Sequence, residues 1–273
     1  MGFERALKKK IALGGVDTEK MARLEAVMAP WKAVAVAYSG GVDSTVLGYL
    51  LGHVFGKPVR LCLVKSPFLA VRELTSARSV ASALRLPLQI LALDLLAVDA
   101  VRYNDTNRCY HCKAAVLQAI GERCKRGEVL VDGSHADDAG QDRPGRKALL
   151  ERDVLSPLAL AGWTKADIRR VARIAGVPNW NKPSQSCLAT RVPHGTSLCA
   201  AILERIEAAE ELLYGMGCLQ VRVRWQREGA LIQLGRQDLW RLNDTERWAH
   251  LLRHMARLGF LHVELDSTPL PSN

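Results

Sequence analysis

The stretch that decides the fold is Ala33-Val34-Ala35-Val36-Ala37-Tyr38-Ser39-Gly40-Gly41-Val42-Asp43-Ser44. Its first half is an apolar run of the length of a buried strand, and residues 44–54 have the composition of a helix that ends near Gly56. A glycine pair between a strand and a helix lets backbone amides turn toward an anion, and the helix N-terminus adds partial positive charge. The stretch therefore predicts a strand-turn-helix unit that binds phosphate groups.

The polar residues of this turn suit pyrophosphate. Ser39 and Ser44 can donate hydroxyl hydrogen bonds to phosphate oxygens, and Asp43 is suited to hold Mg²⁺ or to orient the loop. No Gly-Lys-Ser or Gly-Lys-Thr follows, so the turn is not a kinase-type P-loop. The alternative is that Gly40 and Gly41 only permit a tight turn with backbone angles that other residues avoid.

The same alternation of strand and helix continues along the chain. We expect further strands at residues 59–64, 88–93 and 129–131, a helix at about 69–84, and a helix at Thr164–Ala175 with a capping box. Such alternation predicts an α/β fold with a parallel doubly wound sheet, whose ligands bind at the carboxyl ends of the strands. An amphipathic helix at residues 17–29 precedes the sheet.

The composition changes after Pro178, where a long irregular stretch, residues 179–197, precedes a new pattern. We expect two domains: residues 1–194 with the nucleotide turn, and a small α+β domain at residues 195–273 for substrate binding and oligomerisation. The expected elements of the second domain are helices at 198–214 and 245–258 and strands at 219–225, 230–234 and 261–265.

Composition narrows the class of protein. The chain has 273 residues and a net charge of +10, and the excess falls on residues 1–194, which suits RNA, a nucleotide or a phosphorylated small molecule equally. Its apolar runs are far too short to span a bilayer, and its N-terminus lacks the apolar core of a secretory signal. Seven cysteines without such a signal indicate reduced thiols. We therefore expect a cytoplasmic protein with no membrane partner.

Three cysteines are candidate metal ligands. Cys109 and Cys112 open a predicted helix, and Cys187 lies in the irregular stretch. Three thiolates suit a [4Fe-4S] cluster in which one iron has no protein ligand. A closed zinc site would require a fourth protein ligand, for which His111 is the candidate. For the remaining cysteines we favour a packed or merely reduced thiol: Cys62, Cys124, Cys199 and Cys218.

Six segments together resemble the LarE family, the ATP-dependent sulfur transferases of nickel-pincer cofactor synthesis, which belong to the PP-loop ATP pyrophosphatases. The resemblance implies that pyridinium-3,5-dicarboxylate mononucleotide is adenylated, with release of pyrophosphate, and then converted to thiocarboxylates with release of AMP. It implies ATP, Mg²⁺ and, for members with three cysteines, a [4Fe-4S] cluster. The segments cover almost the whole chain: 39–44, 108–113, 132–138, 143–145, 156–158 and 182–191.

The resemblance also assigns roles to residues. It implies that Cys109, Cys112 and Cys187 hold the cluster, whose open iron carries sulfide and makes catalysis multi-turnover, and that Thr190 stands where the family has Ser. The expected catalytic residues are Cys187, Asp43 and Arg191. The expected binding residues are Ser39, Gly40, Gly41, Asp43, Ser44, Asp137, Arg143, Arg222 and Arg224.

For several of these residues a purely structural or solvent-exposed role remains an alternative. Arg222 and Arg224 alternate on one face of a strand and suit the substrate phosphate, but they also fit a solvated basic face. Asp137 fits a magnesium ligand and the cap of a turn equally. Arg143 and Arg191 fit solvated arginines as well as site residues.

The expected partners are the anionic pyridinium mononucleotide, a sulfide source and further copies of the chain, with a hexamer as one option. Nucleic acid is not expected, because aromatic residues make up 5% of the chain and no RNA-binding module is visible. Three rival functions remain: a tRNA thiolase with the same cluster, an amide-forming synthetase, and a non-catalytic nucleotide-binding sensor.

Overall fold

The computed structural model describes residues 15, 17–138, 144–227 and 229–271. The chain packs into two compact units. Unit 1 comprises Met1–Ser66, Val71–Leu93 and Cys109–Lys182, and unit 2 comprises Pro67–Ala70, Asp94–Arg108 and Pro183–Asn273. Packing thus divides the chain after Lys182 and assigns two earlier segments to unit 2, while the expected domain boundary at 194–195 stays a prediction.

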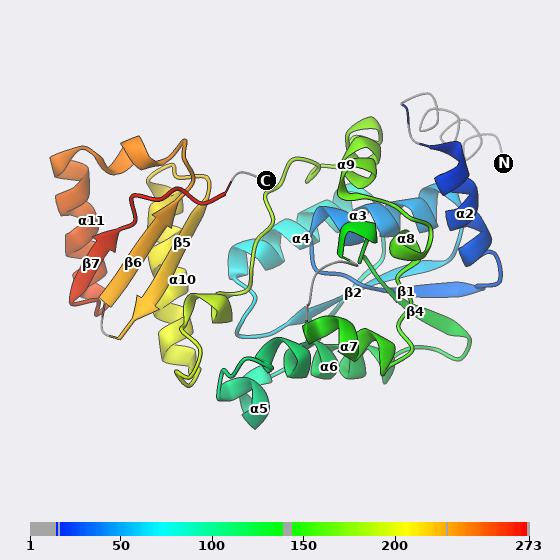
Figure 1. Cartoon of the computed structure of the whole chain (residues 1–273), viewed down its shortest axis with the longest axis horizontal. Coiled ribbons are helices and arrows are strands. Elements are labelled where there is room, and N and C mark those ends of the chain that lie inside the picture. The colour runs from blue at the N-terminus through cyan, green and yellow to red at the C-terminus, as the bar shows by residue number, and fades with distance from the viewer. Residues whose placement is uncertain (1–14, 16, 139–143, 228, 272–273) are drawn as a thin grey trace. The chain divides into compact units, whose positions relative to one another are not determined.

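Unit 1 is built on a four-stranded, all-parallel sheet in the order β3-β2-β1-β4 (Figure 1). The strands are β1 (Ala33–Ala37), β2 (Val59–Lys65), β3 (Leu88–Ala92) and β4 (Glu128–Asp132), so the expected strands are confirmed. In register, Val36 of β1 lies between Leu61 and Val131. Because all strands run the same way, the turns after β1 and β4 meet at one edge of the sheet.

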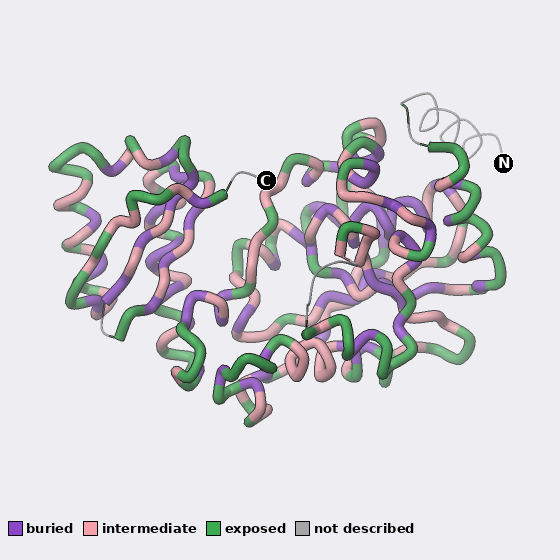
Figure 2. Tube along the Cα trace, viewed as in Figure 1, coloured by how far each residue is buried: buried purple, intermediate pink, exposed green. Residues whose placement is uncertain are grey.

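Helices cover both faces of this sheet, as the α/β pattern predicts (Figure 1). Ala35, Cys62 and Leu91 are buried in contact with Ile120 of helix α6 on one face. The buried residues follow the strands and the inner sides of the helices (Figure 2). The helical elements of unit 1 are α2 (Thr18–Met28), α3 (Val42–Tyr49), the π-helical turn η1 (Leu50–Val54), α4 (Val71–Ala83), α6 (Arg108–Gly121), η3 (Ala136–Asp138), α7 (Pro144–Leu150), α8 (Pro157–Leu160) and α9 (Lys165–Ile174).

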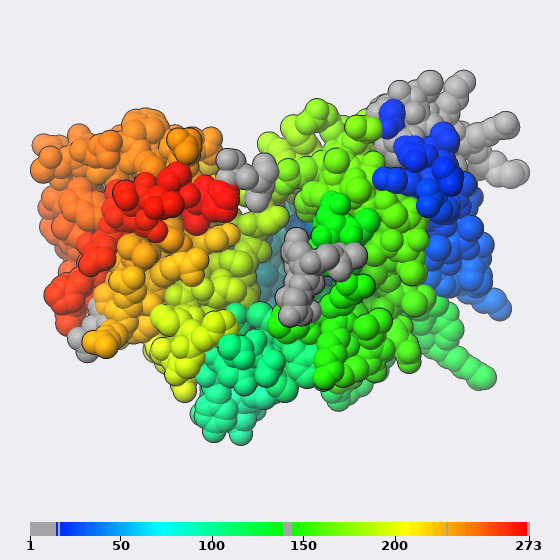
Figure 3. Space-filling model, in the orientation of Figure 1, coloured from blue at the N-terminus to red at the C-terminus, as the bar shows by residue number. Residues whose placement is uncertain are grey.

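Unit 2 contains a three-stranded sheet in the order β5-β6-β7. Strands β5 (Val221–Gln226) and β6 (Gly229–Leu234) are antiparallel, and β7 (His262–Leu265) is parallel to β6. After β7 the chain continues alongside β6, where Leu270 N donates to Leu234 O at 2.8 Å. Figure 3 shows this last segment, coloured red, on the surface of the unit. The helices of unit 2 are η2 (Leu95–Ala97), α5 (Asp99–Arg102), η4 (Leu188–Arg191), α10 (Ala200–Gly215), η5 (Leu239–Leu242) and α11 (Thr245–Arg257).

Within the described parts of both units, none of the helices has the length and apolar character that crossing a membrane requires.

Candidate functional site

The glycine turn after β1 has the tight geometry that its sequence predicts. Gly40 has a φ of +77°, and a Cβ on Gly40 would lie 2.8 Å from the Cβ of Ala77 in α4. Gly41 is the N-cap of α3, so Asp43 and Ser44 lie in the first turn of that helix. The turn therefore requires glycine at position 40 for both backbone angle and space.

Hydrogen bonds fix the turn in place. Ser44 Oγ and Thr45 Oγ1 both donate to Gly41 O, at 3.2 and 2.8 Å. Asn179 is buried, and its Nδ2 donates to Gly40 O at 3.0 Å. The loop is thus held by a residue far along the chain, and within the loop Ser39 N donates to Ser44 Oγ and Gly41 N donates to Ser39 Oγ, both at 3.3 Å.

The end of β4 packs directly against the same turn. A Cβ on Gly133 would lie 2.7 Å from Ser44 N, so only glycine fits there. The neighbouring Asp132 is buried and accepts hydrogen bonds from Ser156 Oγ at 2.7 Å and from Lys113 Nζ at 3.3 Å. The turns after β1 and β4 therefore form one polar site at the carboxyl edge of the sheet.

Lys165, the first residue of α9, completes this site. Its Nζ lies 2.6 Å from both carboxylate oxygens of Asp43. The Asp137 carboxylate accepts a hydrogen bond from Lys165 N at 2.7 Å, so Asp137 caps the start of α9, and its predicted binding role stays a prediction. Arg143 lies outside the described residues.

The candidate cluster ligands come from two segments. Cys109 and Cys112 lie three residues apart at the start of α6, hence on one face of the helix. Cys109 is exposed and Cys112 is half-buried. Cys187 is exposed and is the N-cap of η4 in unit 2. Within unit 2, Arg108 Nη1 donates to Ala189 O at 2.9 Å, so the residue before Cys109 contacts the chain just after Cys187. The shared cluster stays a prediction.

The other cysteines differ from these three in burial or position. Cys62 and Cys218 are buried, and burial raises the pKa of each thiol to about 11. Burial also raises the pKa of the half-buried Cys124, whereas Cys199 is exposed at the N-cap of α10. Buried protonated thiols make poor nucleophiles and ligands, which agrees with packed roles for Cys62 and Cys218.

Arg191 is buried and supports the Cys187 segment. Its guanidinium pairs with Glu210, Nε to Oε1, at 2.8 Å. Arg191 Nη1 donates to Ser186 O at 2.9 Å and to Thr190 Oγ1 at 3.1 Å, on both sides of Cys187. These contacts suit a positioning residue for Cys187, and the expected catalytic role of Arg191 stays a prediction.

Arg222 and Arg224 share the less buried face of β5, opposite the buried Val221 and Val223. Arg224 Nη1 donates to Thr190 O at 3.3 Å, which joins this face to the Cys187 segment. Burial and the charges of Arg191 and Arg224 lower the pKa of Arg222. Since crowding of like charges causes part of this shift, a bound anion would relieve it.

Sequence reasoning missed Lys165 and Asn179, and it quoted Gly133 without a role. Lys165 stands directly after the predicted helix cap Thr164, which places it at a helix N-terminus but does not say what that helix faces. Asn179 lies in the irregular stretch, where no periodic pattern indicates burial.

The chain is similar to known proteins over most of its length. No protein-family model matches the chain. It is 33% identical over 234 residues to an uncharacterized protein of Synechocystis sp., covering 85% of this chain and 87% of the relative. A Methanocaldococcus jannaschii protein, also uncharacterized, is 30% identical over 236 residues, with 85% and 88% covered.

A third relative has a named activity. The pyridinium-3,5-bisthiocarboxylic acid mononucleotide synthase of Lactiplantibacillus plantarum is 32% identical to this chain over 253 residues, which is 90% of each chain. The similarity extends over both the nucleotide turn and the arginine-bearing strand. The chain therefore belongs to the LarE family.

Proposed function

We propose that this protein is an ATP-dependent sulfurtransferase, which adenylates the carboxylates of pyridinium-3,5-dicarboxylate mononucleotide and converts them to thiocarboxylates. The observation that carries the proposal is the glycine turn at the start of α3, with Asp43 and Lys165 beside it, in a LarE-family chain. The product of this chemistry is the compound named for the L. plantarum relative.

Adenylation makes the unreactive carboxylate into an acyl donor. The substrate carboxylate oxygen attacks the α-phosphorus of ATP, and pyrophosphate leaves. The amides of the Gly41 turn and the hydroxyls of Ser39 and Ser44 are suited to bind the departing phosphates. Asp43 would hold Mg²⁺, which supplies charge neutralisation for the leaving pyrophosphate when bound.

Sulfur transfer follows at the acyl-adenylate, where a soft sulfur nucleophile displaces AMP. The donor set suits iron and sulfur chemically, because Cys109 and Cys187 are exposed thiols and Cys112 shares a helix face with Cys109. A [4Fe-4S] cluster held by these three would supply one open iron site for the sulfur. Arg191 and Glu210 would fix the segment that bears Cys187.

The substrate carries two carboxylates and a phosphate, so it needs cationic partners. Arg222 and Arg224 lie side by side on β5 and would bind its phosphate by charge-assisted hydrogen bonds. We further propose a cytoplasmic homo-oligomer that receives sulfide from a separate donor.

The test is pyrophosphate release from ATP with pyridinium dicarboxylate mononucleotide or bulk tRNA as the added substrate. Release with the mononucleotide alone is expected. Release with tRNA alone would assign the basic charge to RNA and refute the proposal. ATP binding without pyrophosphate release in either mixture would favour a nucleotide sensor.

A second experiment addresses the sulfur source. Anaerobically prepared protein should contain iron and acid-labile sulfide, and their absence would refute the cluster. Cys187→Ser should leave pyrophosphate release unchanged and stop thiocarboxylate formation. Cys199→Ser is the matched control, because Cys199 is also exposed but caps α10.

A further inference from the structure

Asn179 is a buried asparagine whose amide nitrogen is bound to the glycine turn. It is 5% exposed, and its Nδ2 donates to Gly40 O at 3.0 Å and to Thr45 Oγ1 at 3.1 Å. An amide nitrogen carries two protons, so these two bonds use both of them. Exchanging the nitrogen and oxygen atoms would place an acceptor against the Gly40 carbonyl, so the bond to that carbonyl fixes the orientation of the amide.

The oxygen of the same amide has a different environment. Within the described part of the chain, Asn179 Oδ1 is buried and accepts no hydrogen bond. A buried acceptor without a partner costs about 1–3 kcal/mol, and a leucine of nearly the same shape would avoid that cost. What asparagine supplies here and leucine does not is therefore the donation to Gly40 O and Thr45 Oγ1.

The bond to Gly40 O determines where the Gly41 amide points. Both groups belong to one planar trans peptide, in which the carbonyl and the amide point in opposite directions. Gly40 has a φ of +77° and no Cβ, so no side chain of its own restrains this peptide plane. Gly41 N donates to Ser39 Oγ at 3.3 Å, a long bond to an exposed residue. A phosphate oxygen can replace this hydroxyl without rotation of the peptide.

Asn179 is itself anchored to α4. Lys182 N donates to Asn179 O at 3.1 Å and closes a turn that begins at Asn179. Lys182 Nζ lies 2.8 Å from Glu73 Oε2 in α4. The same helix bears Ala77, whose Cβ would lie 2.8 Å from a Cβ on Gly40. Asn179 and the glycine turn therefore share one support.

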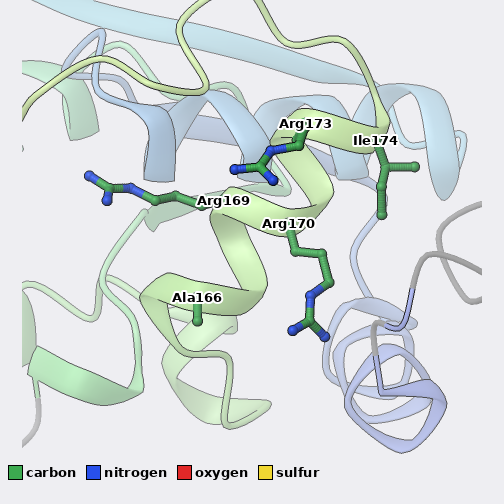
Figure 4. Close-up of a pocket in the computed structure, with 5 residues that line it drawn as sticks. All are labelled: Ala166, Arg169, Arg170, Arg173 and Ile174. Atoms are coloured by element: carbon green, nitrogen blue, oxygen red, sulfur yellow. The ribbon is translucent and has the colours of Figure 1, made fainter.

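Helix α9 provides a second anchor for this turn. The guanidinium of Arg173 lies 4.6 Å from the centre of the Trp180 ring, and Trp180 follows Asn179 directly. Figure 4 shows Arg173 and Arg169 extending to one side of α9 and Arg170 to the other. A cation over an indole ring contributes roughly 0.5–1 kcal/mol at an exposed site. The backbone that carries Asn179 is thus held by both α4 and α9.

We infer that Asn179 is a positioning residue for phosphate binding: it holds the Gly40 carbonyl so that the Gly41 amide is directed at a phosphate oxygen of bound ATP or pyrophosphate. The inference rests on the proposed ATP chemistry and assigns one buried side chain in it. Asn179 acts through the backbone and transfers no proton. Because a hydrogen bond from an amide to a phosphate is charge-assisted, its alignment contributes to affinity.

The test compares side chains of nearly equal shape at position 179. Asn179→Leu removes the donors, and Asn179→Asp replaces them with an acceptor that faces Gly40 O. Calorimetry with Mg²⁺ present should show pyrophosphate bound about tenfold more weakly by Asn179→Leu, and more weakly still by Asn179→Asp. Affinity for AMP, which lacks the β- and γ-phosphates, should change less than about twofold. Asn181→Leu makes the same change at an exposed residue of the same turn and should bind like the unaltered protein.

Failure of the inference and failure of the proposed function give different results. If the unaltered protein binds neither ATP nor pyrophosphate, the proposed function fails and the inference fails with it. If it binds both, and Asn179→Leu and Asn179→Asp bind pyrophosphate as tightly, the inference alone is overturned. It is also overturned if both variants lose pyrophosphate and AMP equally as Tm falls, because Asn179 then only stabilises the fold. Should these variants fail to fold by circular dichroism, Asn179→Ser, which keeps a donor, and Asn179→Ala, which does not, give the same comparison.

Discussion

The glycine turn after β1 in unit 1 and the β5 face that bears Arg222 and Arg224 in unit 2 differ in how their charged side chains are paired. Around the turn the lysines are paired: Lys165 with Asp43 at 2.6 Å, and Lys113 with Asp132 at 3.3 Å. On the face of β5, burial lowers the pKa of Arg222, and the charges of Arg191 and Arg224 lower it further, although Arg191 is paired with Glu210. The turn is balanced before any ligand arrives, whereas the β5 face has excess positive charge.

This difference indicates how each region binds an anion. A balanced site gains little binding free energy from a bare polyphosphate, because its lysines are already ion-paired. It needs a divalent cation to bind the carboxylates and release the lysines. An unbalanced site binds an anion favourably without a divalent cation, since the anion reduces the repulsion between the arginines. We therefore expect the turn to depend on Mg²⁺ and the β5 face to be independent of it.

The largest expected effect is that of Asp43→Ala. Removing this carboxylate unbalances the turn and deletes the proposed magnesium ligand, so substrate-dependent pyrophosphate release should fall at least about 100-fold. The measurement is the initial rate of pyrophosphate release over a range of Mg²⁺ concentrations. Circular dichroism should show an intact fold, because Asp43 is partly exposed. Activity retained in this variant would refute the assignment of the turn.

Substitution of Arg222 should have a smaller and more selective effect. Arg222→Gln removes one charge from the unbalanced face, so KM for the mononucleotide should rise about tenfold while KM for ATP stays the same. The control is Arg236→Gln, which removes an exposed arginine in the same unit. Equal changes in both KM values would mean that the β5 face does not discriminate between the two ligands.

Local patterns were sufficient to predict the parts of the fold that depend on neighbouring residues. The apolar run of β1 and the glycine turn after it can both be read from twelve consecutive residues. The capping box of Thr164 and Asp167 predicted the start of α9, and both of its hydrogen bonds are present. Alternation in β5 predicted that Arg222 and Arg224 share a face.

Contacts between distant residues could not be predicted in this way. Lys165 and Asp43 are 122 residues apart, and Asn179 reaches Gly40 across 139 residues. Residues 94–108 pack in unit 2, where the Nδ2 of the buried Asn104 donates to Pro193 O at 2.8 Å. None of these pairs has a periodic or spacing signal, because each depends on where whole elements pack.

The smallest expected effect is a thermal shift on ligand binding that separates the two regions. Inorganic phosphate binds the β5 face as a bare anion, so it should stabilise the protein equally with and without EDTA. At ten times its dissociation constant, the stabilisation is about 1.4 kcal/mol, or a few degrees in Tm. Stabilisation of the protein by pyrophosphate, which binds at the turn, should depend mostly on added Mg²⁺.

Calorimetric scans of the unaltered protein and of Arg222→Gln check both expectations. The variant should lose the rise in Tm caused by phosphate and keep the magnesium-dependent rise caused by pyrophosphate. A phosphate shift that needs Mg²⁺, or one that survives in Arg222→Gln, would show that the excess charge on β5 does not create an anion site.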